Sequence, residues 1–256
     1  MSPPPNRLTA LYHKHLALKG TMIESEGWIL PERYAGPEKE IGAALGSVGL
    51  SDCSANVKVD VRGKSGEIDG FLGELVPGER IAGRPGQVTP YPDGGGSMGY
   101  VCRLTDEHAL LVLRPRRASP RTSPLEPEID APRNHRVYLT NATSVLAGIT
   151  LIGPAAPHVL SKLSSVDVSL ETLPDPSCTE GGVAGVQCAI IRNGISTPQR
   201  RIDSFDLYVG RGYAEYFWDA LSEAGREVKI VPVGTKACDS VFGRPLRTGV
   251  GARLEG

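Results

Sequence analysis

Residues 204–225, SFDLYVGRGYAEYFWDALSEAG, carry two hydrophobic periods in succession and constrain the fold more than composition does. In the first six residues Phe205, Leu207 and Val209 alternate with polar positions, which is the period of a strand with one face in a core. Two glycines follow, and then apolar residues recur at helical spacing up to Gly225, where a helix commonly ends. The stretch therefore predicts a strand, a glycine turn and an amphipathic helix.

Composition limits the class of protein. The chain has 256 residues, of which 40% are hydrophobic and 22% charged, as in a globular protein of one large domain or two small ones. The 28 basic and 29 acidic residues nearly balance, so we expect neither nucleic acid nor a membrane surface as a partner. No apolar run approaches the roughly 20 residues of a membrane span. Five scattered cysteines without CxxC spacing favour reduced thiols and a cytoplasmic location.

Other stretches predict further elements. Residues 37–48 are expected to form a helix that starts at a proline and stops at Gly49. Residues 100–104 and 109–114 are predicted to pair as a hairpin. Residues 115–134, PRRASPRTSPLEPEIDAPRN, cannot bury enough apolar surface to pack, and we predict a mobile surface excursion there.

Three blocks follow a known pattern in order. The second block is LAGITLIGPAAPHVLSKL at residues 146–163, and the third is FDLYVGRGYAEYFWDALSEAG within residues 204–225. The first block, residues 11–63, matches the pattern at Leu11, Tyr12, His15, Met22, Gly27, Trp28, Pro31, Tyr34, Gly49, Leu50, Asp52, Ser54, Arg62 and Gly63. Together the blocks resemble the glycine-cleavage T-protein family, which consists of folate-dependent aminomethyltransferases.

The resemblance implies an α+β fold. Two ferredoxin-like sheet-and-helix halves would surround a central folate channel, in one unit over residues 7–250 with residues 1–6 frayed. The resemblance stops before the C-terminal barrel domain that full-length members add, so we expect no barrel in this chain. The order of strands and helices predicted from periodicity is compatible with this fold.

The resemblance also implies a cofactor site for tetrahydrofolate. In the family a strand carboxylate holds the pterin ring, and Asp206 matches that position with Asp in place of the usual Glu. A carboxylate can accept two parallel N–H bonds from an aminopyrimidine edge, as it does from arginine. Arg114 stands where the family offers an asparagine to the pterin, and Asn56 falls within the segment that lines the channel. The alternatives are that Asp206 is a solvated strand residue and that Arg114 merely begins the exposed Pro-Arg stretch.

The family's catalytic carboxylate has no counterpart in this sequence. The family motif GGVIDDL is GGGSMGYV here, so that Ser97 and Met98 stand at the two acidic positions. A methionine cannot exchange a proton, which puts aminomethyl transfer in question and leaves Ser97 as a cofactor contact only. Asp93, on the same glycine-rich loop, is either a replacement acid or a turn residue.

Two functions fit these residues. The first is a tetrahydrofolate-binding, aminomethyltransferase-like protein of one-carbon metabolism that acts on a small-molecule one-carbon donor. The alternative is a non-catalytic folate-binding or scaffold subunit, with flavoprotein oxidase partners, of a sarcosine-oxidase-like demethylase complex. Whether the chain is an enzyme stays open between them. No metal site is predicted, because the pair His13 and His15 has no further ligands at suitable spacing.

Overall fold

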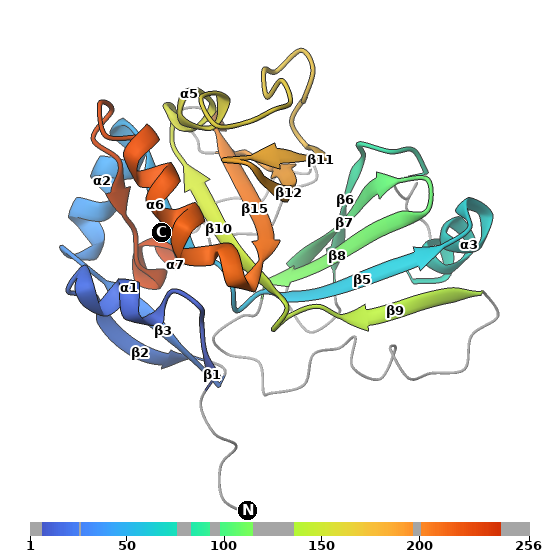
Figure 1. The fold of residues 1–256 in the computed structure, drawn as a ribbon, viewed down its shortest axis with the longest axis horizontal. Helices are drawn as coiled ribbons and strands as arrows, with labels where there is room; N and C mark the ends of the chain where they lie inside the picture. Colours follow the sequence, from blue (N-terminus) through green and yellow to red (C-terminus); the bar gives the residue numbers. More distant parts are fainter. Residues whose placement is uncertain are drawn as a thin grey trace, which may run out of the picture.

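The fold consists of two main β-sheets with helices packed on them (Figure 1). The computed structural model describes residues 7–25, 27–75, 83–92, 98–114, 136–196 and 201–241. Residues 1–6 and 115–134, for which we predicted fraying and mobility, lie outside the described residues.

The first main sheet has six strands in the order β11-β12-β15-β10-β4-β16. All neighbours pair antiparallel except β16, which runs parallel to β4. The strands are β4 Gly49–Asp52, β10 Leu146–Ile152, β11 Ser177–Val183, β12 Val186–Arg192, β15 Ser204–Gly210 and β16 Val231–Pro232.

The second main sheet has five antiparallel strands in the order β6-β7-β8-β5-β9. Its β7 and β8 confirm the predicted hairpin. The strands are β5 Val57–Gly63, β6 Val88–Pro92, β7 Met98–Thr105, β8 His108–Arg114 and β9 Val137–Asn141. Two small sheets consist of β1 Arg7–Leu8, β2 Thr21–Ser25 and β3 Trp28–Arg33, and of β13 Ile195–Ser196 and β14 Arg201–Ile202.

The helices are α1 Tyr12–Ala17, α2 Pro37–Gly46, α3 Ser65–Leu75, α5 Ala156–Ser161, α6 Ala214–Ala224 and α7 Thr235–Val241, with a 3₁₀ turn η1 at Arg211–Tyr213. Helix α2 starts at its proline as predicted, but it ends before Gly49, which is the first residue of β4. A Cβ atom on Gly49 would lie 2.5 Å from Val233 Cγ2 and 2.9 Å from Ala44 Cβ. This glycine therefore permits close packing and does not end the helix.

Strand β15 and helix α6 confirm the two periods of residues 204–225. Phe205 and Leu207 share one hydrophobic cluster with Phe217 of the helix. Gly225 follows the last helical residue, as predicted, but its φ of −90° is not left-handed. Its lack of a side chain instead makes room for Ile230, which would lie 2.7 Å from a Cβ atom.

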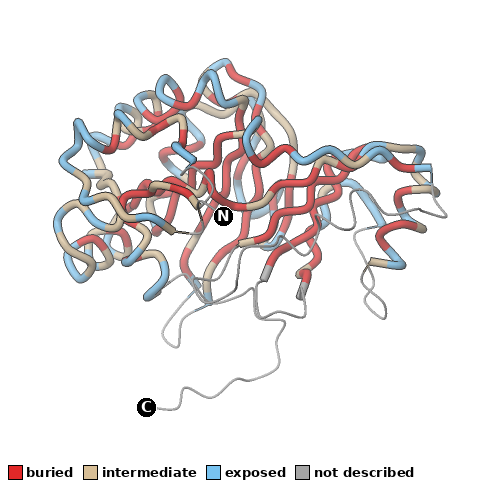
Figure 2. The backbone as a smooth tube through the Cα atoms, turned by 90° about the horizontal axis from the view of Figure 1, so that it is seen from below, coloured by how far each residue is buried: buried red, intermediate tan, exposed pale blue. Residues whose placement is uncertain are grey.

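The two main sheets pack against each other, so that β15 is buried on both faces. Tyr208 of β15 and Ile191 of β12 share a cluster with Tyr100, Cys102 and Val112 of the five-stranded sheet. Figure 2 shows buried residues running through the strands of both sheets. The period of residues 204–209 indicated one core face, and the second sheet covers the other face of β15 as well.

This architecture confirms the α+β class, and the described residues contain no barrel. The ferredoxin-like character of each half stays a prediction. All five cysteines are free thiols, as the sequence indicated. Within the described ranges no helix has the length and apolar character needed to cross a membrane.

Candidate functional site

Asp206 lies on β15 between the two main sheets, and only 1% of the residue is exposed. The hydrogen-bond partners of its carboxylate come from both sheets, from β10 on one side and from β7 and β8 on the other. The alternative of a solvated strand aspartate is therefore wrong. The alternation of β15 put Asp206 on the face opposite Phe205 and Leu207, but alternation alone does not reveal that a second sheet covers the Asp206 face.

Three donors satisfy the Asp206 carboxylate. Thr150 Oγ1 donates to Oδ1 at 2.7 Å, and Tyr100 Oη donates to Oδ2 at 2.6 Å. The guanidinium of Arg114 donates to the same Oδ2 and forms an ion pair with it. Burial alone would raise the pKa of Asp206, but the charge of Arg114 and these hydrogen bonds hold it below its usual value. The carboxylate is therefore charged.

A chain of hydrogen bonds leads away from Asp206 and has one direction. Tyr100 Oη lies 3.1 Å from Tyr208 Oη, which accepts a 3.1 Å bond from Asn56 Nδ2. Because Tyr100 gives its only hydroxyl proton to Asp206, Tyr208 must donate to Tyr100. Burial and the charge of Asp206 raise the pKa values of Tyr100 and Tyr208 well above the ordinary value, so both hydroxyls keep their protons. Each group donates to the next, from Asn56 to Tyr208, from Tyr208 to Tyr100 and from Tyr100 to the accepting carboxylate of Asp206.

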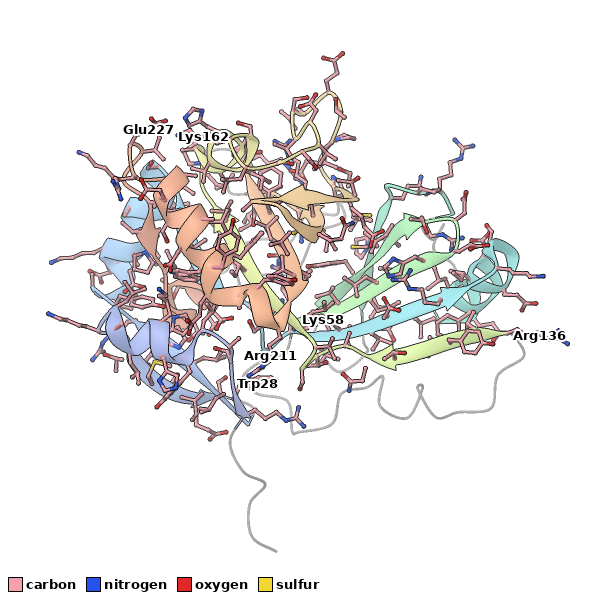
Figure 3. The ribbon with its side chains drawn as sticks, viewed as in Figure 1. Trp28, Lys58, Arg136, Lys162, Arg211 and Glu227 are labelled. Atoms are coloured by element: carbon pink, nitrogen blue, oxygen red, sulfur yellow. The ribbon has the colours of Figure 1, made fainter. Side chains whose placement is uncertain are left out.

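A buried amine lies beside this chain. Lys58 of β5 is fully buried, its Nζ donates to Ser54 O at 2.6 Å, and it lies 5.7 Å from the ring centroid of Tyr208. Burial lowers the pKa of Lys58 to about 8. Figure 3 labels this residue near the place where β5 approaches β10 and β15. Lys58 alternates in the sequence with Val57, Val59 and Val61, which is the period of a half-buried strand and does not by itself indicate that Lys58 is buried.

The structure brings together three of the predicted site residues. Arg114 contacts Asp206 directly, and Asn56 reaches it through two tyrosine hydroxyls. Ser97 and Asp93 lie outside the described residues. Met98 is the first residue of β7, and its Cα pairs with that of Arg114, so this position lies next to the network. The members that sequence analysis missed are Tyr100, Thr150, Tyr208 and Lys58.

A second polar cluster joins α1 to the six-stranded sheet. His15 Nε2 lies 2.9 Å from Asp52 Oδ2, and Tyr34 Oη lies 2.8 Å from His15 Nδ1. The imidazole ring and Trp218 of α6 form a T-shaped pair with 5.4 Å between ring centroids. His13, by contrast, is exposed. These contacts account for His15 as a buried structural residue.

His108 of β8 connects the two main sheets through charge. Its Nε2 lies 2.7 Å from Asp60 Oδ1 in its own sheet, and its Nδ1 forms a 3.2 Å ion pair with Glu180 of β11 in the other. Arg62 donates to Asp60 from the same strand. Burial alone would lower the pKa of His108, but hydrogen bonding to Asp60 and Glu180 raises it.

This raised pKa predicts a pH dependence of stability. A histidine whose folded pKa exceeds its unfolded value of about 6.5 stabilises the fold fully below that pH and loses this contribution as pH rises through the folded pKa. We expect the free energy of unfolding, measured in urea, to fall more between pH 6 and pH 9 in the parent chain than in His108→Gln. An equal fall in the free energy of unfolding of the two proteins would contradict a stabilising role of the His108 contacts with Asp60 and Glu180.

Comparison with known proteins places the chain in a family. Residues 11–242 match the family described as the GCVT N-terminal domain. The chain is similar to the aminomethyltransferase of Desulforamulus reducens, with 27% identity over 97% of this chain and 68% of that protein. It is 30% identical to the aminomethyltransferase of Chloroherpeton thalassium, over 92% of this chain and 63% of that protein. The chain thus spans about two thirds of the length of these relatives.

Two solved structures share the fold. The glycine cleavage system aminomethyltransferase T from Bartonella henselae superposes with a TM-score of 0.70 and 21% identity, over 92% of this chain and 61% of that one. A chain of the heterotetrameric sarcosine oxidase from Corynebacterium sp. U-96 superposes with a TM-score of 0.59 and 17% identity, over 87% of this chain and 96% of that one. With these matches and the ordered sequence blocks, the chain belongs to the glycine-cleavage T-protein family, through its GCVT N-terminal domain.

Proposed function

We propose that the chain binds a reduced folate of the tetrahydrofolate class between its two main sheets, with Asp206 holding the pterin, and acts in one-carbon metabolism. The observation that carries this proposal is the burial of a charged carboxylate where β7, β8 and β10 converge on it. Burial of an unpaired charge is unfavourable in free energy. Buried ionisable residues with shifted pKa values therefore cluster at functional sites, where their chemistry is needed. The aminomethyltransferase relatives supply the cofactor class.

The other site residues take roles around this anchor. Asn56 would fix the tyrosine hydroxyls that orient the carboxylate, and Arg114 would lie at the entrance, where it is 31% exposed. Ser97 would contribute a hydroxyl contact from its loop, and Asp93 is the candidate acid of the same loop. Two ferredoxin-like halves around a channel would leave the cofactor in the centre of the fold.

The proposal predicts that folate affinity depends on the charge of Asp206. Calorimetric titration with tetrahydrofolate is expected to show binding by the parent chain. For Asp206→Asn, a loss of about 1.5–3 kcal/mol, roughly 10- to 100-fold in affinity, is expected because charge-assisted hydrogen bonds are lost.

The control is Glu215→Gln on the exposed side of α6, which should bind like the parent chain. Equal affinity of the parent and Asp206→Asn would remove the assigned role of Asp206. Absence of affinity both in the parent chain and in a variant without the Arg114 guanidinium would remove the proposed function. Circular dichroism of each variant separates a loss of binding from a loss of folding.

The second candidate is a non-catalytic subunit of a multi-subunit oxidase. It is favoured by Ser97 and Met98, which stand where the family carries its catalytic carboxylate. A chain of a heterotetrameric sarcosine oxidase shares the fold, so this fold also occurs within a multi-subunit oxidase. Flavoprotein oxidase subunits would be the partners, and the small-molecule one-carbon donor would then be activated on them.

Two experiments separate the candidates. Restoring an acid by Met98→Asp and assaying methylene-folate formation tests the transferase. Holding donor and acceptor in line can supply about 7–11 kcal/mol of the barrier. A channel that still positions both and lacks only the acid should therefore gain activity. A gain of activity favours an enzyme with an intact channel. Stable copurification with oxidase subunits, with no activity of the isolated chain or of Met98→Asp, favours the subunit.

A further inference from the structure

The three partners of Asp206 differ in their access to water. Tyr100 and Thr150 are 1% and 7% exposed, whereas the side chain of Arg114 is 31% exposed. Arg114 is therefore the partner of Asp206 with the greatest access to solvent. Arg114 is also the last residue of β8, and its Cα is held in register by the pairing with β7. Release of the carboxylate would therefore be a movement of the Arg114 side chain, with the backbone of β8 held in place.

The hydrogen bonds on Asp206 define what would remain if Arg114 left. A carboxylate offers about four acceptor positions, two on each oxygen. Thr150 uses one position on Oδ1, while Tyr100 and Arg114 use both positions on Oδ2. Departure of Arg114 would leave one free position on each oxygen. One free position on each oxygen is what a pair of parallel N–H donors requires.

The vacated site has a definite chemical preference. Parallel N–H donors on one flat group occur in guanidines, amidines and 2-aminopyrimidine edges, and the guanidinium of Arg114 itself belongs to this class. The ring of Tyr100, whose centroid lies 5.8 Å from Arg114 Cζ, adds an aromatic surface beside the same position. A ligand of this class would replace one flat N–H donor by another, so the carboxylate would not lose its partners.

We propose that the guanidinium of Arg114 occupies, as an internal substitute, a binding site on Asp206 for a planar N–C–N donor edge, and that a ligand must displace it. The proposal rests on the proposed function only for the natural ligand, which would be the aminopyrimidine edge of a reduced folate. Arg114 thereby competes with the cofactor and sets the affinity of the site.

The test uses two small probes, methylguanidinium and 2-amino-4-hydroxypteridine, titrated calorimetrically into the parent chain, Arg114→Ala and the double variant Arg114→Ala/Asp206→Asn. We expect Arg114→Ala to bind both probes at least tenfold more tightly than the parent chain, and the double variant to lose this gain. Arg114→Lys, which keeps the charge without the flat donor pair, is expected to lie between the parent chain and Arg114→Ala.

Two outcomes overturn the proposal. One is that Arg114→Ala binds the probes no better than the parent chain, and the other is that the double variant keeps the gain. Arg114→Met, which keeps the packing of the arginine stem, replaces Arg114→Ala if the latter is unfolded by circular dichroism.

Titration with tetrahydrofolate separates this proposal from the folate assignment. If Arg114→Ala binds the probes and no variant binds tetrahydrofolate, the site on Asp206 is supported and the folate assignment is wrong. If the parent chain and Arg114→Ala bind tetrahydrofolate equally well and the probes bind no more tightly to Arg114→Ala, the folate assignment is supported. Competition by Arg114 is then contradicted.

Discussion

Asp206→Ala is expected to lower the free energy of unfolding by about 3–5 kcal/mol, the cost of removing one partner of a buried ion pair. Arg114 would lose its counter-charge, and the hydroxyl groups of Tyr100 and Thr150 would lose their acceptor in a place that water does not reach. Folded domains are stable by about 5–15 kcal/mol, so the loss is a large share of the total. Urea unfolding at neutral pH measures it.

Asp219→Ala is the matched control. Asp219 also pairs with a cation, Lys14 at 2.8 Å, but its side chain is 60% exposed. Exposed pairs contribute about 0–1 kcal/mol, so this variant should unfold close to the parent chain. Similar losses for the two aspartate variants would show that the buried pair does not hold the sheets together.

Phe217→Ala is expected to cost about 3–5 kcal/mol, because a large buried side chain would leave a cavity between α6 and the six-stranded sheet. Phe217 is 0% exposed and belongs to the cluster that contains Phe205 and Leu207 of β15. The midpoint of urea unfolding measures the loss. Glu215→Ala, on the exposed side of the same helix, should change stability by less than about 0.5 kcal/mol. A small effect of Phe217→Ala would mean that α6 can detach without loss of the core.

Local periodicity was sufficient to predict β15 and α6 but not what surrounds them. The alternation in residues 204–209 and the helical spacing after it depend on neighbours in the sequence, and β15 and α6 match both. Which faces are buried depends on a sheet formed by β5–β9, far away along the chain. The burial of Asp206 and Lys58 could not be read from their own strands for this reason.

The candidate site was predictable to the extent that the family pattern marks it. The pattern pointed to Asp206, Arg114 and Asn56, and the structure places them in one network. It gave no reason to single out Tyr100 or Thr150, because a tyrosine and a threonine in strands are ordinary β residues. Their roles follow only from the register that brings β7 and β10 to the carboxylate.

The single direction of the hydrogen-bond chain from Asn56 to Asp206 restricts how this part of the sequence can evolve. Tyr208 accepts from Asn56 and donates to Tyr100, so a phenylalanine there would remove the acceptor of one neighbour and the donor of the other. Residues in one hydrogen-bond network are coupled, so substitutions at Asn56, Tyr208 and Tyr100 are expected to change stability non-additively. A change at one of these positions then alters which residues are acceptable at the next.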